Sequence, residues 1–230
     1  MNPYRYDIQT LERKARAVRR HIVRLNANSP AGGHTGADLS QVELLTALYF
    51  RVLNVAPDRL DDPQRDIYIQ SKGHAVGCYY CVLAEAGFFP VEWLETYQHA
   101  NSHLPGHPVR QNSNWEAALA AAHYGLDNLV IINDKNNLQL AGPTREIMNT
   151  DPLADKWRAF GMEVSECQGN DMASVVSVIE GLKQEGKPNV IIANTTKGAG
   201  ISFIQGRPEW HHRVPKGEEI ALALEELKDE

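Results

Sequence analysis

The sequence has no long hydrophobic run, no excess of positive charge and few cysteines. No apolar stretch approaches the roughly 20 residues that a membrane-spanning helix needs, and residues 1–5 lack the apolar core of a secretion signal. A net charge of −6 argues against a surface that binds nucleic acid over its whole extent. We therefore expect a cytoplasmic protein with neither a membrane nor a nucleic acid as partner.

The cysteines, Cys78, Cys81 and Cys167, are odd in number, which predicts reduced thiols rather than a disulfide framework. Cys78 and Cys81 have a redox spacing, but they fall inside an expected helix over residues 75–86, without the preceding strand of a thioredoxin-like unit. A structural role is therefore favoured. A zinc site formed by His74, Cys78 and Cys81 would need a fourth ligand that the sequence does not place nearby.

The size and composition suit one large α/β domain over residues 1–230, with 43% apolar and 23% charged residues. The second half alternates short strand-like runs with helical stretches. This alternation predicts βαβ crossovers and a parallel sheet with helices on both faces. The expected strands are residues 128–133, 162–165 and 189–194, and the expected helices are residues 115–124, 153–160 and 172–183.

The first half is predicted to be mainly helical. Residues 8–25 carry an apolar stripe at steps of three and four, and the basic residues between them are interpreted as a solvated face. Ser40 and Glu43 have the form of a capping box, which predicts that a second helix begins there and that His34 lies in the preceding loop. Residues 66–70 are predicted to form a short strand that leads into the segment of His74.

Three short segments in the first half each place a histidine beside a glycine. Glycine allows the backbone to approach a ligand closely, and a neutral imidazole can transfer a proton or donate a hydrogen bond near pH 7. Each segment alone fits an ordinary loop residue, but three in succession favour a ligand site. The segments are Gly33-His34-Thr35-Gly36, Ser71-Lys72-Gly73-His74-Ala75 and Pro105-Gly106-His107-Pro108.

Together with residues 133–142 and the late segment Trp210-His211-His212, these motifs resemble the N-terminal, diphosphate-binding half of transketolase over nearly the whole chain. The resemblance implies the thiamin-diphosphate-binding fold, with thiamine diphosphate and Mg²⁺ (or Ca²⁺ or Mn²⁺) as cofactors. It also implies the transfer of a two-carbon ketol unit from a ketose phosphate to an aldose, so that sugar phosphates are the expected substrates.

The resemblance assigns catalytic roles to His34, His107 and His211 at the carbonyl and hydroxyl oxygens of the substrate. It places His74 beside the diphosphate of the cofactor. Histidines would supply acid–base and hydrogen-bond assistance where charge develops.

The resemblance also implies a metal site, in which Asn136 supplies an amide oxygen and Leu138 a backbone carbonyl. Oxygen ligands of this kind suit Mg²⁺. Glu116 would bind at the cofactor as part of a carboxylate network that links active sites across a subunit interface. Lys197 could bind a phosphate, although a solvated lysine is the favoured interpretation. His103, His123 and His212 match no family role and are expected to be ordinary loop or surface residues.

The Gly-Asp-Gly turn that precedes the Asn136 motif in thiamine-diphosphate enzymes occurs nowhere in the sequence. In transketolase-like proteins the junction after His107 holds on the order of 40 to 50 residues, more than the about 30 of one βαβ unit. Either a segment is absent from the sequence between about residues 110 and 113, or the subunit has lost its cofactor loop. We favour the absent segment, because deletion of a central strand would uncover sheet edges and apolar helix faces.

The glutamate that activates the cofactor belongs, in this family, to a pyrimidine-binding domain that lies beyond the end of this chain. The resemblance therefore implies that the partner is a C-terminal transketolase subunit and that two such pairs form a heterotetramer. A non-catalytic interaction or regulatory subunit is the alternative. A metal-dependent hydrolase is disfavoured because the histidine segments lack ligand spacing and a nearby carboxylate. The half of a 2-oxoacid dehydrogenase or of a deoxyxylulose-phosphate synthase fits the three histidine segments less well.

Overall fold

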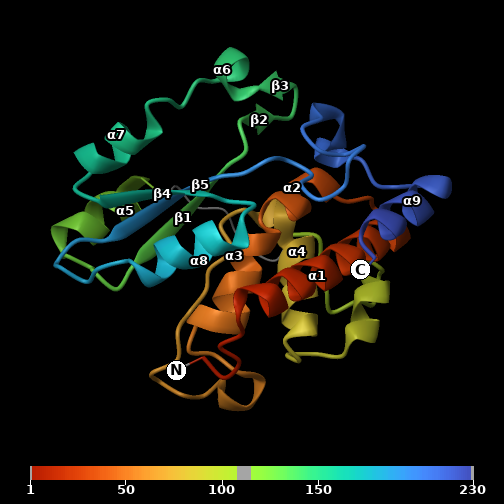
Figure 1. The fold of residues 1–230 in the computed structure, drawn as a ribbon, viewed down its shortest axis with the longest axis horizontal. Coiled ribbons are helices and arrows are strands. Elements are labelled where there is room, and N and C mark those ends of the chain that lie inside the picture. The colour runs from red at the N-terminus through yellow and green to blue at the C-terminus, as the bar shows by residue number, and fades with distance from the viewer. Residues whose placement is uncertain (1, 108–114, 229–230) are drawn as a thin grey trace.

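The computed structural model describes residues 2–107 and 115–228, without the side chains of residues 115–117. A helical half built on the long helix α1 lies beside an α/β half that contains the sheet (Figure 1). In the described part of the first half, the elements are α1 (Ile8–Asn28), α2 (Thr35–Ser40), α3 (Val42–Ala47), η1 (Leu48–Val52), η2 (Pro57–Arg59), η3 (Gly73–Ala75), α4 (Val76–Glu85) and η4 (Val91–Thr96).

The second half alternates strands and helices, as its sequence predicts. None of the helices within the described ranges is long and apolar enough to cross a membrane. The elements are α5 (Trp115–His123), β1 (Val130–Lys135), β2 (Leu138–Gln139), β3 (Gly142–Pro143), α6 (Thr144–Ile147), α7 (Leu153–Ala159), β4 (Glu163–Gln168), α8 (Met172–Glu180), β5 (Asn189–Asn194), η5 (Pro208–His212) and α9 (Glu218–Glu226).

The main sheet has the strand order β1-β5-β4, and both pairs of neighbours are parallel. Successive residues of the central strand face opposite sides. Val190 and Ile192 pack against a cluster that includes Ala118 of α5 and Trp157 of α7, whereas Ile191 belongs to the larger core of the helical half. Helices therefore cover both faces of the parallel sheet, which confirms the predicted fold class.

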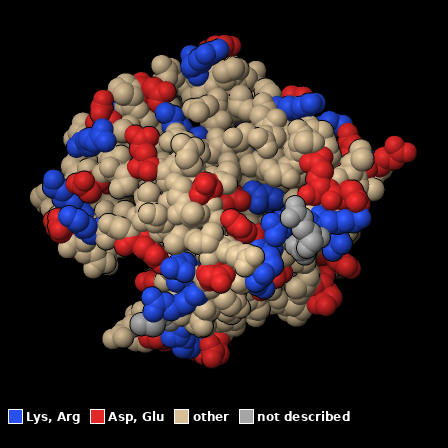
Figure 2. All heavy atoms as spheres, in the orientation of Figure 1, with Lys and Arg blue, Asp and Glu red and all other residues tan. Residues whose placement is uncertain are grey.

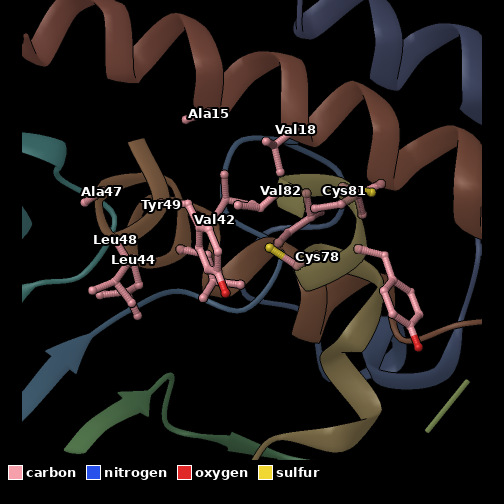
Figure 3. Close-up of a cluster of buried hydrophobic side chains, with 14 of the residues drawn as sticks. Ala15, Val18, Val42, Leu44, Ala47, Leu48, Tyr49, Cys78, Cys81 and Val82 are labelled. Carbon is pink, nitrogen blue, oxygen red and sulfur yellow. The ribbon is translucent and has the colours of Figure 1, made fainter. Parts of the chain in front are cut away.

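The core of the helical half forms because α1 buries one stripe of side chains. Asp7 caps the helix by accepting a hydrogen bond from the Thr10 backbone N–H at 2.8 Å. Figure 3 shows Ala15 and Val18 of α1 in the cluster that also contains side chains of α3 and α4 such as Val42. The stripe at steps of three and four thus packs α1 against α3 and α4, which follow the segments of His34 and His74.

Three local predictions are wrong. Residues 66–70 form no strand, because they pair with no neighbouring strand in the described structure and leave Ile67 and Ile69 exposed. Ser40 does not cap the next helix: it is the last residue of α2, and α3 begins at Val42 with Gln41 before it, because the Ser40 hydroxyl is bound to the Asp134 carboxylate. Arg19 is not on a solvated face, since its guanidinium is buried against the Glu43 carboxylate at 2.7 Å.

Charged side chains are mixed over the surface. On the face shown in Figure 2, lysines and arginines are interspersed with aspartates and glutamates. This mixture fits the small net charge of −6.

The central position of β5 predicts that its core side chains dominate stability. Ile191→Ala removes a side chain that is 0% exposed and should lower the free energy of unfolding by about 2 to 5 kcal/mol. Ile67→Ala, at a residue that is 72% exposed, is the matched control and should change it by less than about 0.5 kcal/mol. Urea denaturation followed by circular dichroism measures both. Equal losses in the two variants would contradict the assigned core.

Candidate functional site

Polar side chains gather where the three parallel strands end. Asp134 stands near the end of β1, Asn170 follows β4, and Thr195 follows β5. The carboxyl ends of parallel strands meet at one edge of a sheet, and ligands of open α/β folds bind at this edge. The candidate site therefore lies at the edge to which the helical half contributes its histidine segments.

The Asp134 carboxylate holds three segments together at this edge. It accepts a hydrogen bond from the Ser40 hydroxyl of α2 at 2.6 Å, forms an ion pair with the Lys72 ammonium and accepts a short hydrogen bond from the Thr195 hydroxyl. Burial by itself would raise the pKa of Asp134, but the Lys72 ammonium and the hydroxyl donors lower it overall. Asp134 thus stays ionised and fixes Lys72, two residues before His74.

A second set of hydrogen bonds ties the helical half to the loops after β4 and β5. The Asn170 amide donates to the Ser40 carbonyl oxygen at 3.2 Å and to the Glu43 carboxylate at 3.1 Å. Its carbonyl oxygen accepts from the Thr196 backbone N–H at 2.6 Å. These bonds hold the Lys197 loop against α2.

His34 stands directly before α2, and two glycines beside it permit close packing. A Cβ at Gly33 would lie 1.8 Å from the side-chain oxygen of Asn26 on α1. A Cβ at Gly36 would lie 2.8 Å from the Lys197 side chain and 2.9 Å from the Trp210 carbonyl oxygen. The Gly-His-Thr-Gly segment therefore fits between α1, the Lys197 loop and η5 only because both positions lack a side chain.

The His34 ring is the centre of a cluster of imidazoles. Its ring centroid lies 5.2 Å from that of His74, 5.9 Å from that of His107 and 5.6 Å from that of His211. His74 and His211 stack on each other at 5.4 Å. The structure therefore brings together all four histidines that the sequence selected. His212 is exposed, as predicted for a surface residue, but its ring also lies 4.5 Å from that of His34.

Lys197 connects the histidine cluster to the segment after β1. Its ammonium lies 3.0 Å from His211 Nδ1 and donates to the Leu138 carbonyl oxygen at 3.3 Å. The residue is only 2% exposed, so its interpretation as a solvated lysine is wrong. The side chain follows a buried strand and passes over Gly36, which allows its aliphatic part to be buried while the ammonium reaches the site.

Burial and the repulsion between positive charges lower the pKa values of several groups in the site. Burial, followed by the charge of His212, lowers the pKa of His34 to about 4. Burial, followed by the charge of Lys72, lowers the pKa of His74 to about 3. Burial also lowers the pKa of Lys197 to about 8 and that of His211 below its ordinary value. His34 and His74 are therefore neutral at pH 7 and can each donate and accept a hydrogen bond.

The part of the predicted site that would bind the metal ion is incomplete. Asn136 accepts a hydrogen bond from the Leu138 backbone N–H at 3.1 Å, and the Leu138 carbonyl oxygen accepts one from Lys197. No group of three metal-binding histidine, cysteine, aspartate or glutamate side chains occurs within the described ranges. The described residues thus do not by themselves form a metal site.

The remaining predicted residues fall elsewhere. The side chain of Glu116 lies outside the described residues. His103 stacks on Trp93, and His123 contacts Tyr124. Sequence analysis missed Asp134 and Lys72 as partners of the site. The signal for Asp134 was its place at the end of an expected strand, and Lys72 lies within the quoted Ser-Lys-Gly-His-Ala segment.

The fold and the site together define an α/β protein of the thiamine-diphosphate-binding class. The profile of the family described as "Transketolase, thiamine diphosphate binding domain" matches residues 12–117 and 109–228. The chain belongs to this family, which confirms the resemblance found in its motifs.

Some relatives align with this chain over nearly their whole length. The chain is 59% identical to an apulose-4-phosphate transketolase subunit of Actinobacillus succinogenes, over 100% of both chains. It is 33% identical to the 6-deoxy-6-sulfo-D-fructose transketolase subunit SqwG of a Clostridium species, over 86% of this chain and 89% of the relative. The alignment with the Actinobacillus protein spans 276 positions, whereas this chain has 230 residues.

Solved transketolases share the fold. The transketolase of Campylobacter jejuni superposes with a TM-score of 0.85 at 23% identity, over 96% of this chain and 43% of that one. The chain thus spans about two fifths of the length of a solved transketolase.

The Lys72–Asp134 pair predicts a measurable coupling between the two halves of the molecule. Lys72→Met should lower the free energy of unfolding by about 2 to 3 kcal/mol, because it leaves a nearly buried carboxylate without its cation. Lys135→Met is the matched control. Its partner Asp151 is more than half exposed, so the expected loss is below about 1 kcal/mol. Chemical denaturation measures both, and a Lys72→Met loss no larger than that of the control would contradict the coupling.

Proposed function

We propose that this chain is the N-terminal, diphosphate-binding subunit of a split transketolase, and that residues 1–230 belong to one such domain. The observation that carries the proposal is the convergence of His34, His74, His107 and His211 at the carboxyl edge of the sheet. Four imidazole rings that meet at one place suit a substrate with several hydroxyl groups and a carbonyl.

Each group has a role that its position supports. His34, at the centre of the cluster, and His211, beside Lys197, would hold or transfer protons at substrate oxygens. His107, which is more exposed, would bind a donor hydroxyl, and His74 would lie against the cofactor diphosphate. The Lys197 ammonium would bind negative charge near Leu138. Thiamine diphosphate, when bound, would supply the carbanion-stabilising chemistry that these side chains lack.

The substrate is proposed to be a ketose phosphate. The name of the 59% identical relative favours apulose 4-phosphate, while the name of the second relative keeps a sulfonated ketose as a candidate. The Lys197 ammonium gives the edge of the site positive charge that suits an anionic cofactor or substrate.

We further propose that the intact protein contains a segment between about residues 110 and 113 that this sequence lacks. Three observations support it. The matches to the family profile meet and overlap at residues 109–117, and the alignment with the 59% identical relative spans 276 positions against 230 residues here. In the described structure β1 is also an edge strand with an exposed Val130, although strands of parallel α/β sheets are usually buried. The segment would supply the missing carboxylate ligand for Mg²⁺ beside Asn136 and Leu138.

A partner subunit with the pyrimidine-binding domain would complete the enzyme in a cytoplasmic heterotetramer. The relatives' designation as subunits supports a partner. The arm formed by β2, β3 and α6 at the top of Figure 1 also supports it, because Leu140, Ile147 and Met148 are exposed there. Glu116 would lie in the carboxylate network at this interface.

The second candidate function is a non-catalytic interaction or regulatory subunit. The incomplete metal site favours this regulatory function, because the oxygens of Asn136 and Leu138 are already hydrogen-bonded within the chain. The two functions differ in whether the cofactor segment exists in the intact protein.

The intact mass of the purified protein separates the two functions. We expect electrospray mass spectrometry to give a mass several kilodaltons above 25.6 kDa, with the extra peptide mapped by protease digestion between residues 107 and 115. A mass of 25.6 kDa, allowing for loss of the initiator methionine, would contradict the absent segment and favour the regulatory function.

A reconstitution assay tests the ketol-transfer proposal. The chain mixed with a C-terminal transketolase subunit, thiamine diphosphate and Mg²⁺ should convert apulose 4-phosphate and an aldose phosphate, whereas the chain alone should not. His34→Gln in the complex should lower kcat about 10²- to 10⁴-fold, because a proton-transfer group is lost. His123→Gln, outside the cluster, is the matched control.

Each outcome of the reconstitution assay bears on a separate part of the proposal. Turnover by the chain alone would contradict the split enzyme. Full activity without added thiamine diphosphate, after dialysis against a chelator, would contradict the cofactor assignment. An unchanged kcat in His34→Gln would contradict the assigned role of the cluster.

A further inference from the structure

His212 has no role in the function proposed above, although it lies closest to the centre of the site. Its ring centroid is 4.5 Å from that of His34 and the ring planes meet at 83°. The other three rings around His34 lie at 5.2 to 5.9 Å. His212 therefore makes the tightest ring contact of His34 while remaining exposed on its other side.

The position of His212 is fixed by anchored residues on both sides. His211 lies 3.0 Å from the Lys197 ammonium. The Arg213 guanidinium stacks 4.2 Å above the buried Trp210 ring and forms an ion pair with Glu219 at 2.5 Å. The end of η5 is thus held at both neighbours of His212, which restricts where its side chain can lie.

The loop before His34 accommodates the same ring. Gly32 has φ of +80°, and a Cβ placed there would lie 3.7 Å from His212 Cε1. The ring of His212 consequently lies against the glycine and in edge-to-face contact with the His34 ring.

We propose that His212 is a positioning residue for His34, which covers the His34 ring against water and keeps it in its neutral, oriented form. The importance of this effect for catalysis rests on the proposed function, but the effect itself is a property of the chain. His212 does not need to touch the substrate to act in this way.

The electrostatic surroundings of His34 include His212. Burial is the first cause that lowers the pKa of His34, and the charge of His212 is the largest of the coulombic causes. Edge-to-face contact adds to burial, and a protonated His212 would repel a second positive charge. The titratable and charged groups around His34 are His74 and Lys72 near η3, His107 in the loop after η4, Lys197 after β5, His211 and His212 on η5, and Asp38 on α2.

Titration of His34 in the full chain tests the inference without any activity measurement. Nitrogen-15-labelled histidines are followed by NMR between pH 3 and 8, and the His34 signals are assigned by their loss in His34→Gln. In the unaltered chain we expect a midpoint near pH 4. His212→Ala removes both the ring and its charge and should raise the midpoint by about half a unit or more.

A second variant and a control keep the test decisive. His212→Phe keeps a ring of similar size, so it should raise the midpoint less than His212→Ala, and it decides the question if His212→Ala does not fold. His123→Ala should leave the midpoint unchanged. Circular dichroism at each pH establishes that the fold persists. An unchanged His34 midpoint in the folded His212 variants would overturn the inference, whereas failure of ketol transfer alone would overturn only the proposed function.

Discussion

The ionised Asp134 carboxylate is the interaction on which the polar end of this molecule depends. It is nearly buried, so its negative charge must be balanced by partners inside the protein. The partners are the Lys72 ammonium beside η3, the Ser40 hydroxyl of α2 and the Thr195 hydroxyl after β5. Lys72, Ser40 and Thr195 are far apart in sequence, yet all three bind this carboxylate: Lys72 and Ser40 at Oδ2 and Thr195 at Oδ1. Strand β1, helix α2 and the segment that contains Lys72 and His74 are thereby held in one arrangement.

That arrangement explains the protonation of the site. The Lys72 charge is drawn to Asp134, and Lys197 is held between His211 and the Leu138 carbonyl oxygen, so the imidazoles lie in a setting that already contains two ammonium groups. Additional protons are disfavoured there, so His34 and His74 remain hydrogen-bonding groups rather than cations.

Strand β1, which carries Asp134, lies at the outer side of the described sheet. β5 is buried on both faces, while β1, its neighbour, is left with an exposed side at Val130. The Asn136 side-chain oxygen accepts from the Leu138 backbone N–H, and the Leu138 carbonyl oxygen accepts from Lys197. The proposed further strand and turn beside β1 would account for both the exposed Val130 and the incomplete metal site.

Sequence reasoning was sufficient to predict the fold class, the three parallel strands and the four histidines of the cluster. Hydrophobic periodicity predicted the elements, glycine beside histidine marked the segments of His34, His74 and His107, and the family resemblance added His211. The burial of Lys197, the contact of His212 with His34 and the pairing of Asp134 with Lys72 became evident only in three dimensions. The physical reason is that burial and ion pairing depend on which segments meet in the fold. The segments that meet here lie far apart along the sequence.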